Sequence, residues 1–463
     1  MFCKTLEIGL VASVFLAVAG FGGTEPVSWT ISQDLIFLLG ALLVLQPGAR
    51  TAVTKSPALW IVAALSVWIV VQWLGARHGK IGIDAHAIEA RGLAFAASVT
   101  GFFVARDVAR DRAARKRLAL ALIGLALFES LYGLAQYLGG WQFIWGYRRR
   151  FYTGSATGTY INHNHFAGLL EMILPFCVAL AMYQWNTVAG HSRRRPLRHF
   201  LERLGEPDVM KGVVLALVAV LFFVAIVFSF SRMGLISASV SLAVLAALAW
   251  LGRRLGRGDA KIVVACLAVG VAVAAWIGPG PVVEHFEQLS HDEPLAAGTS
   301  EGRMALWRAA AELIRAHPLT GAGLGCFEFA FTRVQSTQLT LVIDHAHNDY
   351  IELAVELGVP AAALLVFLLF FAVVRALRNA LRTQSRLNRA LGSGAAAGAI
   401  ALLVHSAADF NLYIPANALV FAVVLAIGCS VPLKEPLEDS AADAWHYRIR
   451  TSETSSTHSA PAI

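Results

Sequence analysis

The sequence predicts an all-α, polytopic membrane protein with about twelve transmembrane helices and one long, partly helical loop between helices nine and ten. Of its 463 residues, 57% are hydrophobic and 15% are charged, and the mean hydropathy is +0.62. A soluble globular chain of this length does not have that composition. Apolar runs of about 17 to 22 residues, long enough to cross the hydrocarbon core as helices, recur along the chain. The expected spans are 5–22, 31–47, 58–75, 89–105, 118–138, 165–184, 212–230, 234–251, 261–278, 351–374, 393–412 and 416–432.

Basic residues gather in the connections after the fourth, sixth, eighth and tenth spans, and Lys and Arg are preferentially retained on the cytoplasmic side of a membrane. These residues are Arg106, Arg110, Arg112, Arg115, Lys116, Arg117, Arg193, Arg194, Arg195, Arg198, Arg203, Arg253, Arg254, Arg257, Arg375, Arg378, Arg382, Arg386 and Arg389. Both termini are therefore expected in the cytoplasm, with segment 279–350 on the outer side. Because the net charge of +8 is divided among separate loops, it gives little support to nucleic-acid binding.

Residues 1–432 are expected to form one transmembrane domain that includes the outer loop 279–350. Residues 433–463 are polar and rich in Ser and Thr, which predicts a disordered cytoplasmic tail. The five cysteines are scattered without a Cys-x-x-Cys pair, so neither a disulfide framework nor a zinc site is indicated.

The long outer loop is expected to contain an amphipathic helix that begins near Ser300 as its cap and ends before Pro318. Its apolar face would carry Met304, Trp307, Ala311 and Ile314. Arg303 falls in the first turn, where unpaired backbone amides and the helix dipole favour an anion, so a phosphate site is one interpretation. The other is an ordinary solvated arginine.

Two further arginine positions are candidates for binding an anion. Arg232 interrupts a nearly continuous apolar stretch, which would cost about 2.5 to 3.5 kcal/mol at the centre of a membrane helix, and it either has a function or extends to the interface. Arg148, Arg149 and Arg150 lie together in an outer loop, against the positive-inside trend, and are candidates for binding anionic lipid or a phosphorylated ligand, with Arg150 the one expected to contact substrate. That bias is statistical and tolerates exceptions.

The segment 344–350, Asp-His-Ala-His-Asn-Asp-Tyr, gathers titratable groups at the start of an apolar run. His345 and His347 allow three interpretations: a metal site, a general base with an orienting neighbour, or a solvated turn. A third metal ligand at fixed spacing is not evident, and the chain has no Asp-x-Asp motif of the kind that holds a catalytic divalent ion. The general base is the stronger hypothesis, because an imidazole can take a proton from a hydroxyl near neutral pH.

Other polar residues near the spans have less specific roles. Asn162 and Asn164 precede a helix, where they could hydrogen-bond a sugar, although one of them could instead cap the helix. The glycine-rich run 321–325 lacks the features of a phosphate loop and is interpreted as a flexible turn. Hydrogen bonding between helices is the expected role for most of the acidic residues in the spans, and His405 and Asp409 can meet on one helix face. The acidic residues are Glu129, Glu171, Glu352, Glu356 and Asp409.

Three patches of this sequence resemble the O-antigen ligase and polymerase superfamily of bacterial envelope enzymes. They are the Asn-His element 158–167 before a helix with Pro175, the motif 231–234 (Ser-Arg-Met-Gly), and the outer block from 302 to 358, which ends in His-Asn-Asp-Tyr and Glu-Leu-Gly. With the expected topology, the resemblance covers most of the chain from about 150 to 430.

The resemblance implies a fold of the GT-C-like type and a metal-independent inverting glycosyltransferase without a cofactor, located in the bacterial inner membrane. It would move a glycan from an undecaprenyl diphosphate carrier to the hydroxyl of a glycan or lipid A core acceptor at the periplasmic face. His347 would be the base, since the family pattern places His directly before Asn, and Arg232 and Arg303 would hold the diphosphate. His345, Asn348 and Asp349 would orient the ring or bind substrate.

Alternatives remain open from the sequence. Ligation to a lipid A core and polymerisation of repeat units share this chemistry and differ in the acceptor. A secondary transporter of a small solute is also consistent with the number of spans, although transporter sites lie near the membrane midplane and not in one outer loop. An assembly factor without activity would not need Arg232 or Arg303.

Overall fold

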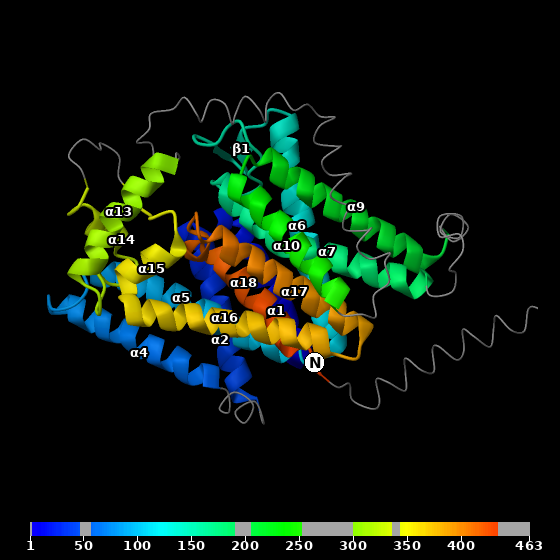
Figure 1. The fold of residues 1–463 in the computed structure, drawn as a ribbon, viewed down its shortest axis with the longest axis horizontal. Helices are drawn as coiled ribbons and strands as arrows, with labels where there is room; N and C mark the ends of the chain where they lie inside the picture. Colours follow the sequence, from blue (N-terminus) through cyan, green and yellow to red (C-terminus); the bar gives the residue numbers. More distant parts are fainter. Residues whose placement is uncertain (1, 47–56, 190–204, 252–299, 336–342, 434–463) are drawn as a thin grey trace, which may run out of the picture.

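The computed structural model describes residues 2–46, 57–189, 205–251, 300–335 and 343–433, and within these ranges the fold is almost entirely helical (Figure 1). Ten of the described helices are long and apolar enough to cross a membrane, and one further apolar helix is shorter. The ten are α1 (Phe2–Ala19), α2 (Pro26–Leu45), α4 (Pro57–Arg77), α5 (Ala85–Val108), α6 (Arg112–Leu138), α7 (His163–Ala189), α9 (Pro207–Phe228), α10 (Arg232–Leu251), α16 (Val359–Arg382) and α17 (Arg386–His405); the shorter one is α18 (Pro415–Ser430). The chain is a multi-pass membrane protein.

The shorter elements cluster at the ends of these helices. A two-stranded antiparallel hairpin pairs β1 (Phe143–Ile144) with β2 (Tyr147–Arg148). Two 3₁₀ turns, η1 (Phe21–Gly23) and η2 (Asn411–Tyr413), lie in connections. The helices α13 (Ser300–Ala316), α14 (Phe327–Phe331) and α15 (Asp349–Leu357) pack together at one end of the bundle, at the left of Figure 1.

Local sequence signals set several helix starts. Asp84 caps α5 by accepting a hydrogen bond from the Ala87 amide, and Asp111 does the same for α6 through Ala114, both at 2.7 Å. Proline occupies one of the first two positions of α2, α9, α16 and α18, where its missing N–H has no helical partner to lose.

The expected spans fall on these helices, with three exceptions. Span 261–278 lies outside the described residues, 351–374 is not one helix, and 393–412 runs past the end of α17 at His405 into the loop that holds Asp409. Gly358, with φ of +79°, separates α15 from α16, and a Cβ there would lie 2.4 Å from the Leu319 carbonyl oxygen. Only glycine adopts this conformation at such close range without strain. The break makes α15 an independent short helix whose N-terminus can be positioned separately from the membrane span.

The connection after α13 is not the flexible turn expected from its glycines. The amide of Ala322 donates to Val355, that of Gly323 to Glu356, and that of Val359 to the carbonyl of Pro318. The side-chain amide of Gln72 on α4 donates to the carbonyls of Thr320 and Glu356, both at 2.8 Å. These bonds fasten α13, α15 and α4 together, so the region that precedes the histidine segment has a fixed frame.

The core lies between α7, α17 and α9, and α7 is almost completely buried. A Cβ at Gly398 of α17 would lie 2.1 Å from the carbonyl oxygen of Met172, and one at Gly394 would lie 3.0 Å from Phe176. Small residues of this kind allow two membrane helices to approach closely. The close packing fixes α7 against α17, and the two helices contribute side chains to the same polar cluster.

The helix expected in the outer loop is present as α13, but its buried face differs from the expected one. Met304 is exposed, whereas Leu306, Ala310 and Leu313 are buried. The difference arises because α13 packs against α14 and α15, which sequence periodicity alone does not reveal. The cap expected at Ser300 falls on a side chain outside the described part, as does most of the tail 433–463.

Candidate active site

The histidine segment is held in place by the residues expected to bind substrate beside it. Asn348 is the N-cap of α15, and its side-chain oxygen accepts from the amides of Tyr350 and Ile351 at 3.0 and 3.1 Å. Its side-chain nitrogen donates to the carbonyl of Ala407 at 2.8 Å. Asp349 is fully buried, and its carboxylate accepts from the amide of Leu412 at 3.0 Å. Asn348 and Asp349 therefore tie α15 to the loop after α17.

His347 is half-buried and contacts a carboxylate far away in the sequence. Its Nδ1 atom lies 3.4 Å from Oδ1 of Asp409, in the loop between α17 and η2. Its backbone φ is 47°, in the left-handed region that L-residues with a large side chain rarely occupy. Residues held in this conformation cluster at functional sites, because the surrounding structure must impose it.

Asp409 is the centre of a buried polar cluster. Oδ1 lies 3.9 Å from Nε2 of His165, the third residue of α7, and Oδ2 lies 3.9 Å from Nε2 of His405, the last residue of α17. Burial alone would raise the pKa of Asp409, but the hydrogen bond with His347 and the neighbouring imidazoles outweigh it and lower the pKa below its ordinary value. Behind this cluster, Nδ1 of His405 lies 3.0 Å from Glu171 on α7. The carboxylate of Asp409 is thus positioned to remain ionised beside His347.

His345 has a different carboxylate partner. Its Nδ1 atom lies 2.6 Å from Oε1 of Glu352, whose Oε2 accepts from the amide of Ala346 at 2.8 Å. Burial would lower the pKa of His345, but the charge and the hydrogen bond of Glu352 outweigh this and raise it above its usual 6.5. His345 and Glu352 form an ion pair that shapes the backbone on the N-terminal side of His347.

One aromatic ring contacts three of these imidazoles. Phe410 stacks on His345 with ring centroids 3.9 Å apart, and it meets His165 and His347 edge to face at 4.6 and 5.1 Å. Such contacts fix the orientation of the imidazole rings as well as their positions.

Arg303 lies near the histidine segment through its place on α13. Trp307, one helical turn further along, donates from its indole nitrogen to the carbonyl of Ala346 at 2.9 Å, and residues four apart share a helix face. The Arg303 side chain is half-buried, and its Nε atom is buried with no hydrogen-bond partner among the described residues. Tyr152 also interacts electrostatically with Arg303, Asp344 and Asp409, which places all of these groups around one region.

Arg232 is the first residue of α10 and is exposed. The motif around it fixes this helix end against α7: a Cβ at Gly234 would lie 2.6 Å from Cβ of Ala167, and the carbonyl of Ser229 contacts Nδ1 of His163. The first turn of α7 also carries His165, which approaches Asp409. The start of α10 therefore lies at the same end of the bundle as the cluster around Asp409.

The remaining predicted positions have less direct links to the cluster. Arg150 is exposed, while its neighbour Arg149 is buried. The guanidinium of Arg149 donates to the carbonyl of Ser155 and the hydroxyl of Thr157, both at 2.9 Å, and to the side-chain oxygen of Gln142 at 2.6 Å, which fixes the loop that follows against Gln142. Asn162 accepts from the amide of Asn164 at 2.8 Å, as a helix cap does. The half-buried side chain of Asn164 shows no hydrogen bond within the described ranges. Arg149 was not singled out by the sequence, because neighbouring arginines are equivalent until the loop is folded.

The sequence also left Asp409 without a role at the site. Its only sequence signal was the spacing of four residues from His405.

Within the described part of the chain, no group of three or more His, Cys, Asp or Glu side chains is arranged to hold a metal ion.

Residues 217–366 match the family described as O-antigen ligase. This segment contains α10 with Arg232, α13 with Arg303 and the whole histidine segment through α15. No protein with a curated function matches the chain. Residues 217–366, which carry the arginine and histidine elements, are therefore similar to the O-antigen ligase family, in a chain with ten candidate membrane spans among its described helices.

Proposed function

We propose that this protein is a metal-independent, inverting glycosyltransferase that moves a glycan from undecaprenyl diphosphate to an acceptor hydroxyl, as an O-antigen ligase or a surface polysaccharide polymerase. The observation that carries the proposal is the contact between His347 and Asp409. Trp307 of α13, the helix that also carries Arg303, is hydrogen-bonded to Ala346, the residue before His347. A base with an orienting carboxylate and a cation on an adjacent element are the groups that this reaction requires.

His347 acts as the general base. When the Asp409 carboxylate accepts a hydrogen bond from Nδ1–H, the proton of the neutral ring stays on Nδ1, and Nε2 keeps its lone pair and can take the proton of the acceptor hydroxyl. The hydroxyl oxygen then forms a bond to the anomeric carbon as the bond from that carbon to the diphosphate oxygen breaks. The diphosphate leaves with the electron pair, and the imidazole carries the proton.

Arg303 and Arg232 hold the leaving group. Negative charge accumulates on the diphosphate as the sugar departs, and guanidinium groups stabilise it by charge-assisted hydrogen bonds. The buried Nε of Arg303 has no hydrogen-bond partner within the described residues, which supports a role in binding an anion. Arg232 lies at the first turn of α10, where the helix dipole adds to its charge.

The same proposal assigns the other parts of the site. His345 orients the backbone of His347 through its pair with Glu352, and Asn164 and Arg150 contact the glycan or its carrier. The acceptor is a glycan or a lipid A core, and membrane lipids surround the protein next to the site. The enzyme works in the bacterial inner membrane with its site on the periplasmic face and both termini in the cytoplasm, as the basic loops indicate.

The location of the polar groups supports an enzyme over a secondary transporter. Segment 344–350 and residues 406–410 form loops and short helices beyond the ends of α16 and α17, whereas transporter sites lie near the midplane in broken helices. Solute uptake by proteoliposomes that contain this protein alone would favour the transporter.

The test is the variant His347→Ala in a strain that lacks the native gene, read as the lipopolysaccharide pattern on a gel. The variant should lose the long chains while its amount in the membrane stays normal. His317→Ala, an exposed histidine just beyond α13, is the matched control and should restore the wild-type pattern. Normal polysaccharide from His347→Ala would exclude His347 as the base.

The deletion strain itself separates the two reactions. Loss of all long chains with accumulation of free carrier-linked polymer indicates a ligase. Cores capped with a single repeat unit indicate a polymerase.

A further inference from the structure

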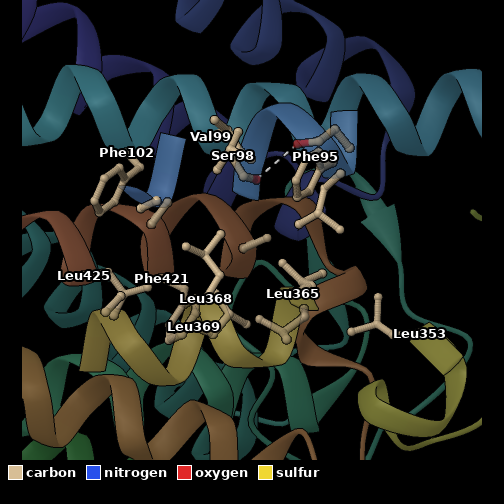
Figure 2. A pocket seen from close by; sticks show the side chains of 18 of the residues that line it. Phe95, Ser98, Val99, Phe102, Leu353, Leu365, Leu368, Leu369, Phe421 and Leu425 are labelled. Atoms are coloured by element: carbon tan, nitrogen blue, oxygen red, sulfur yellow. Dashed lines mark hydrogen bonds between the residues drawn. The ribbon is translucent and has the colours of Figure 1, made fainter. Parts of the chain in front are cut away.

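An elongated apolar cavity of about 240 Å³ lies between α4, α5, α16 and α18, and only one of its ends approaches the histidine segment. Figure 2 shows Phe95, Val99 and Phe102 of α5 on one side of it, with Leu365 and Leu369 of α16 and further side chains of α18 on the other. Ser98 also lines the cavity, but its hydroxyl donates to the carbonyl of Ala94 in its own helix at 3.1 Å. The middle of the cavity therefore offers a ligand only hydrocarbon surface.

Arginine side chains line both ends of this cavity. Arg91 and Arg106 both belong to α5, and the rise of the helix between them places them about 22 Å apart along its axis. Arg91 is already engaged: its guanidinium donates to the carbonyl of Tyr413 at 2.6 Å and lies over the ring of Tyr413. That end of the cavity adjoins the histidine cluster, since Tyr413 also contacts the ring of His345.

The opposite end has a pair of like charges. Arg106 of α5 and Arg375 of α16 both line the cavity and interact electrostatically as like charges. Neither forms an ion pair within 4.0 Å of a carboxylate among the described residues; Asp107 is bound to Arg110 at 2.8 Å and acts on Arg106 only through its charge. Arg106 is half-buried and Arg375 is exposed, so the two guanidinium groups can meet an anion at the mouth of the apolar cavity, where it would relieve their mutual repulsion.

We propose that this cavity binds an anionic phospholipid of the bilayer, with its phosphate between Arg106 and Arg375 and one acyl chain along α5 and α16. The hydrocarbon of one leaflet is about 15 Å deep, half of the bilayer core, so the chain reaches from the arginines to the level of Phe95. Basic pockets between membrane helices bind anionic head groups in this way. The bound lipid fills the space between α5, α16 and α18 and belongs to the leaflet opposite the histidine cluster. This assignment does not depend on the reaction proposed above.

The test measures the binding of phosphatidylglycerol to the purified full-length protein in detergent by native mass spectrometry, with phosphatidylcholine of the same acyl chains as the neutral probe. The wild type should retain phosphatidylglycerol much more tightly than phosphatidylcholine. The double variant Arg106→Gln/Arg375→Gln should bind phosphatidylglycerol about thirtyfold more weakly. The control Arg378→Gln/Arg382→Gln removes two exposed arginines of the same helix that do not line the cavity, and its affinity should stay unchanged.

A second pair of variants tests the chain separately from the head group. Ala372→Phe fills the cavity near Arg375 without removing a charge and should weaken phosphatidylglycerol binding, whereas Ala418→Phe fills the end near Tyr413 and should not. Unchanged binding to Ala372→Phe, or equal affinity for the two phospholipids, would overturn the proposal. Displacement of phosphatidylglycerol from the wild type by undecaprenyl phosphate would also overturn it, because the cavity would then hold the carrier.

Discussion

Nδ1 of His347 lies 3.4 Å from Oδ1 of Asp409, although 62 positions separate the two residues in the sequence. The same carboxylate oxygen accepts from the amide of Phe410 at 2.9 Å, which fixes its direction. The carboxylate is therefore oriented before any substrate binds, and it faces the imidazole that we propose as the base.

Replacing Asp409 by Asn should slow glycan transfer by about 10²- to 10⁴-fold, because the amide neither stabilises an imidazolium nor reliably selects the ring tautomer of His347. The measurement is the rate of transfer by purified protein in liposomes. The double variant His347→Ala/Asp409→Asn should be no slower than His347→Ala alone, since the two residues act as one unit. Additive losses would show that Asp409 acts independently of His347.

Replacing Arg303 by Gln should lower the transfer rate by a similar factor, because the leaving diphosphate loses a charge-assisted contact. Arg303→Lys should recover only part of the rate, since an ammonium group cannot make bidentate hydrogen bonds. The matched control is Arg308→Gln, an exposed arginine of the same helix, which should keep wild-type activity. Equal rates for Arg303→Gln and Arg308→Gln would remove Arg303 from the site.

The pair of His345 and Glu352 should make stability depend on pH. The pKa of His345 is raised in the folded protein, so the pair stabilises the fold fully below about pH 6.5, the unfolded value, and loses this contribution as the pH rises through the folded pKa. Thermal unfolding in detergent should therefore show the largest difference between wild type and Glu352→Gln at low pH. A difference in unfolding temperature between wild type and Glu352→Gln that is the same at every pH would contradict the ion pair.

Arg149 and Arg150 should differ sharply when each is replaced by Ala. Loss of Arg149 leaves several buried acceptors of the loop 152–157 unsatisfied and should lower the free energy of unfolding by about 1.5 to 3 kcal/mol. Loss of the exposed Arg150 should change it by less than about 0.5 kcal/mol. The unfolding midpoints of the two variants test this, and similar midpoints would show that the Arg149 contacts do not stabilise the loop.

The sequence predicted the helical architecture well because membrane spans carry a strong local signal. Length and hydropathy located the described spans, and Ser300 and Pro318 bracketed α13. The break at Gly358 was missed, because the apolar run continues through it and only the contact with Leu319 explains why a glycine is required there. The buried face of α13 was misplaced for the same reason, since it depends on neighbours from another part of the chain.

The candidate site was predicted from its motifs, but the connections between its residues were not. His347 and Arg303 were identified by residue type and position, and their roles stay predictions. Asp409 was paired with His405 by helical spacing, whereas its contacts with His347 and His165 join segments that are distant in the sequence. Glu352, expected to bond between helices, instead binds His345. Contacts of this range are set by packing, which periodicity and spacing do not encode.

The ring of Phe410 would restrict how a sugar reaches the base that we propose. Its edge-on contact covers one side of the His347 imidazole, and its stacked face covers His345. A hydroxyl that reaches His347 must therefore arrive from the uncovered side, with the rest of its sugar turned away from the phenyl ring. A single apolar side chain that takes part in no proton transfer would thereby select which hydroxyl of an acceptor is glycosylated, and so the linkage of the product.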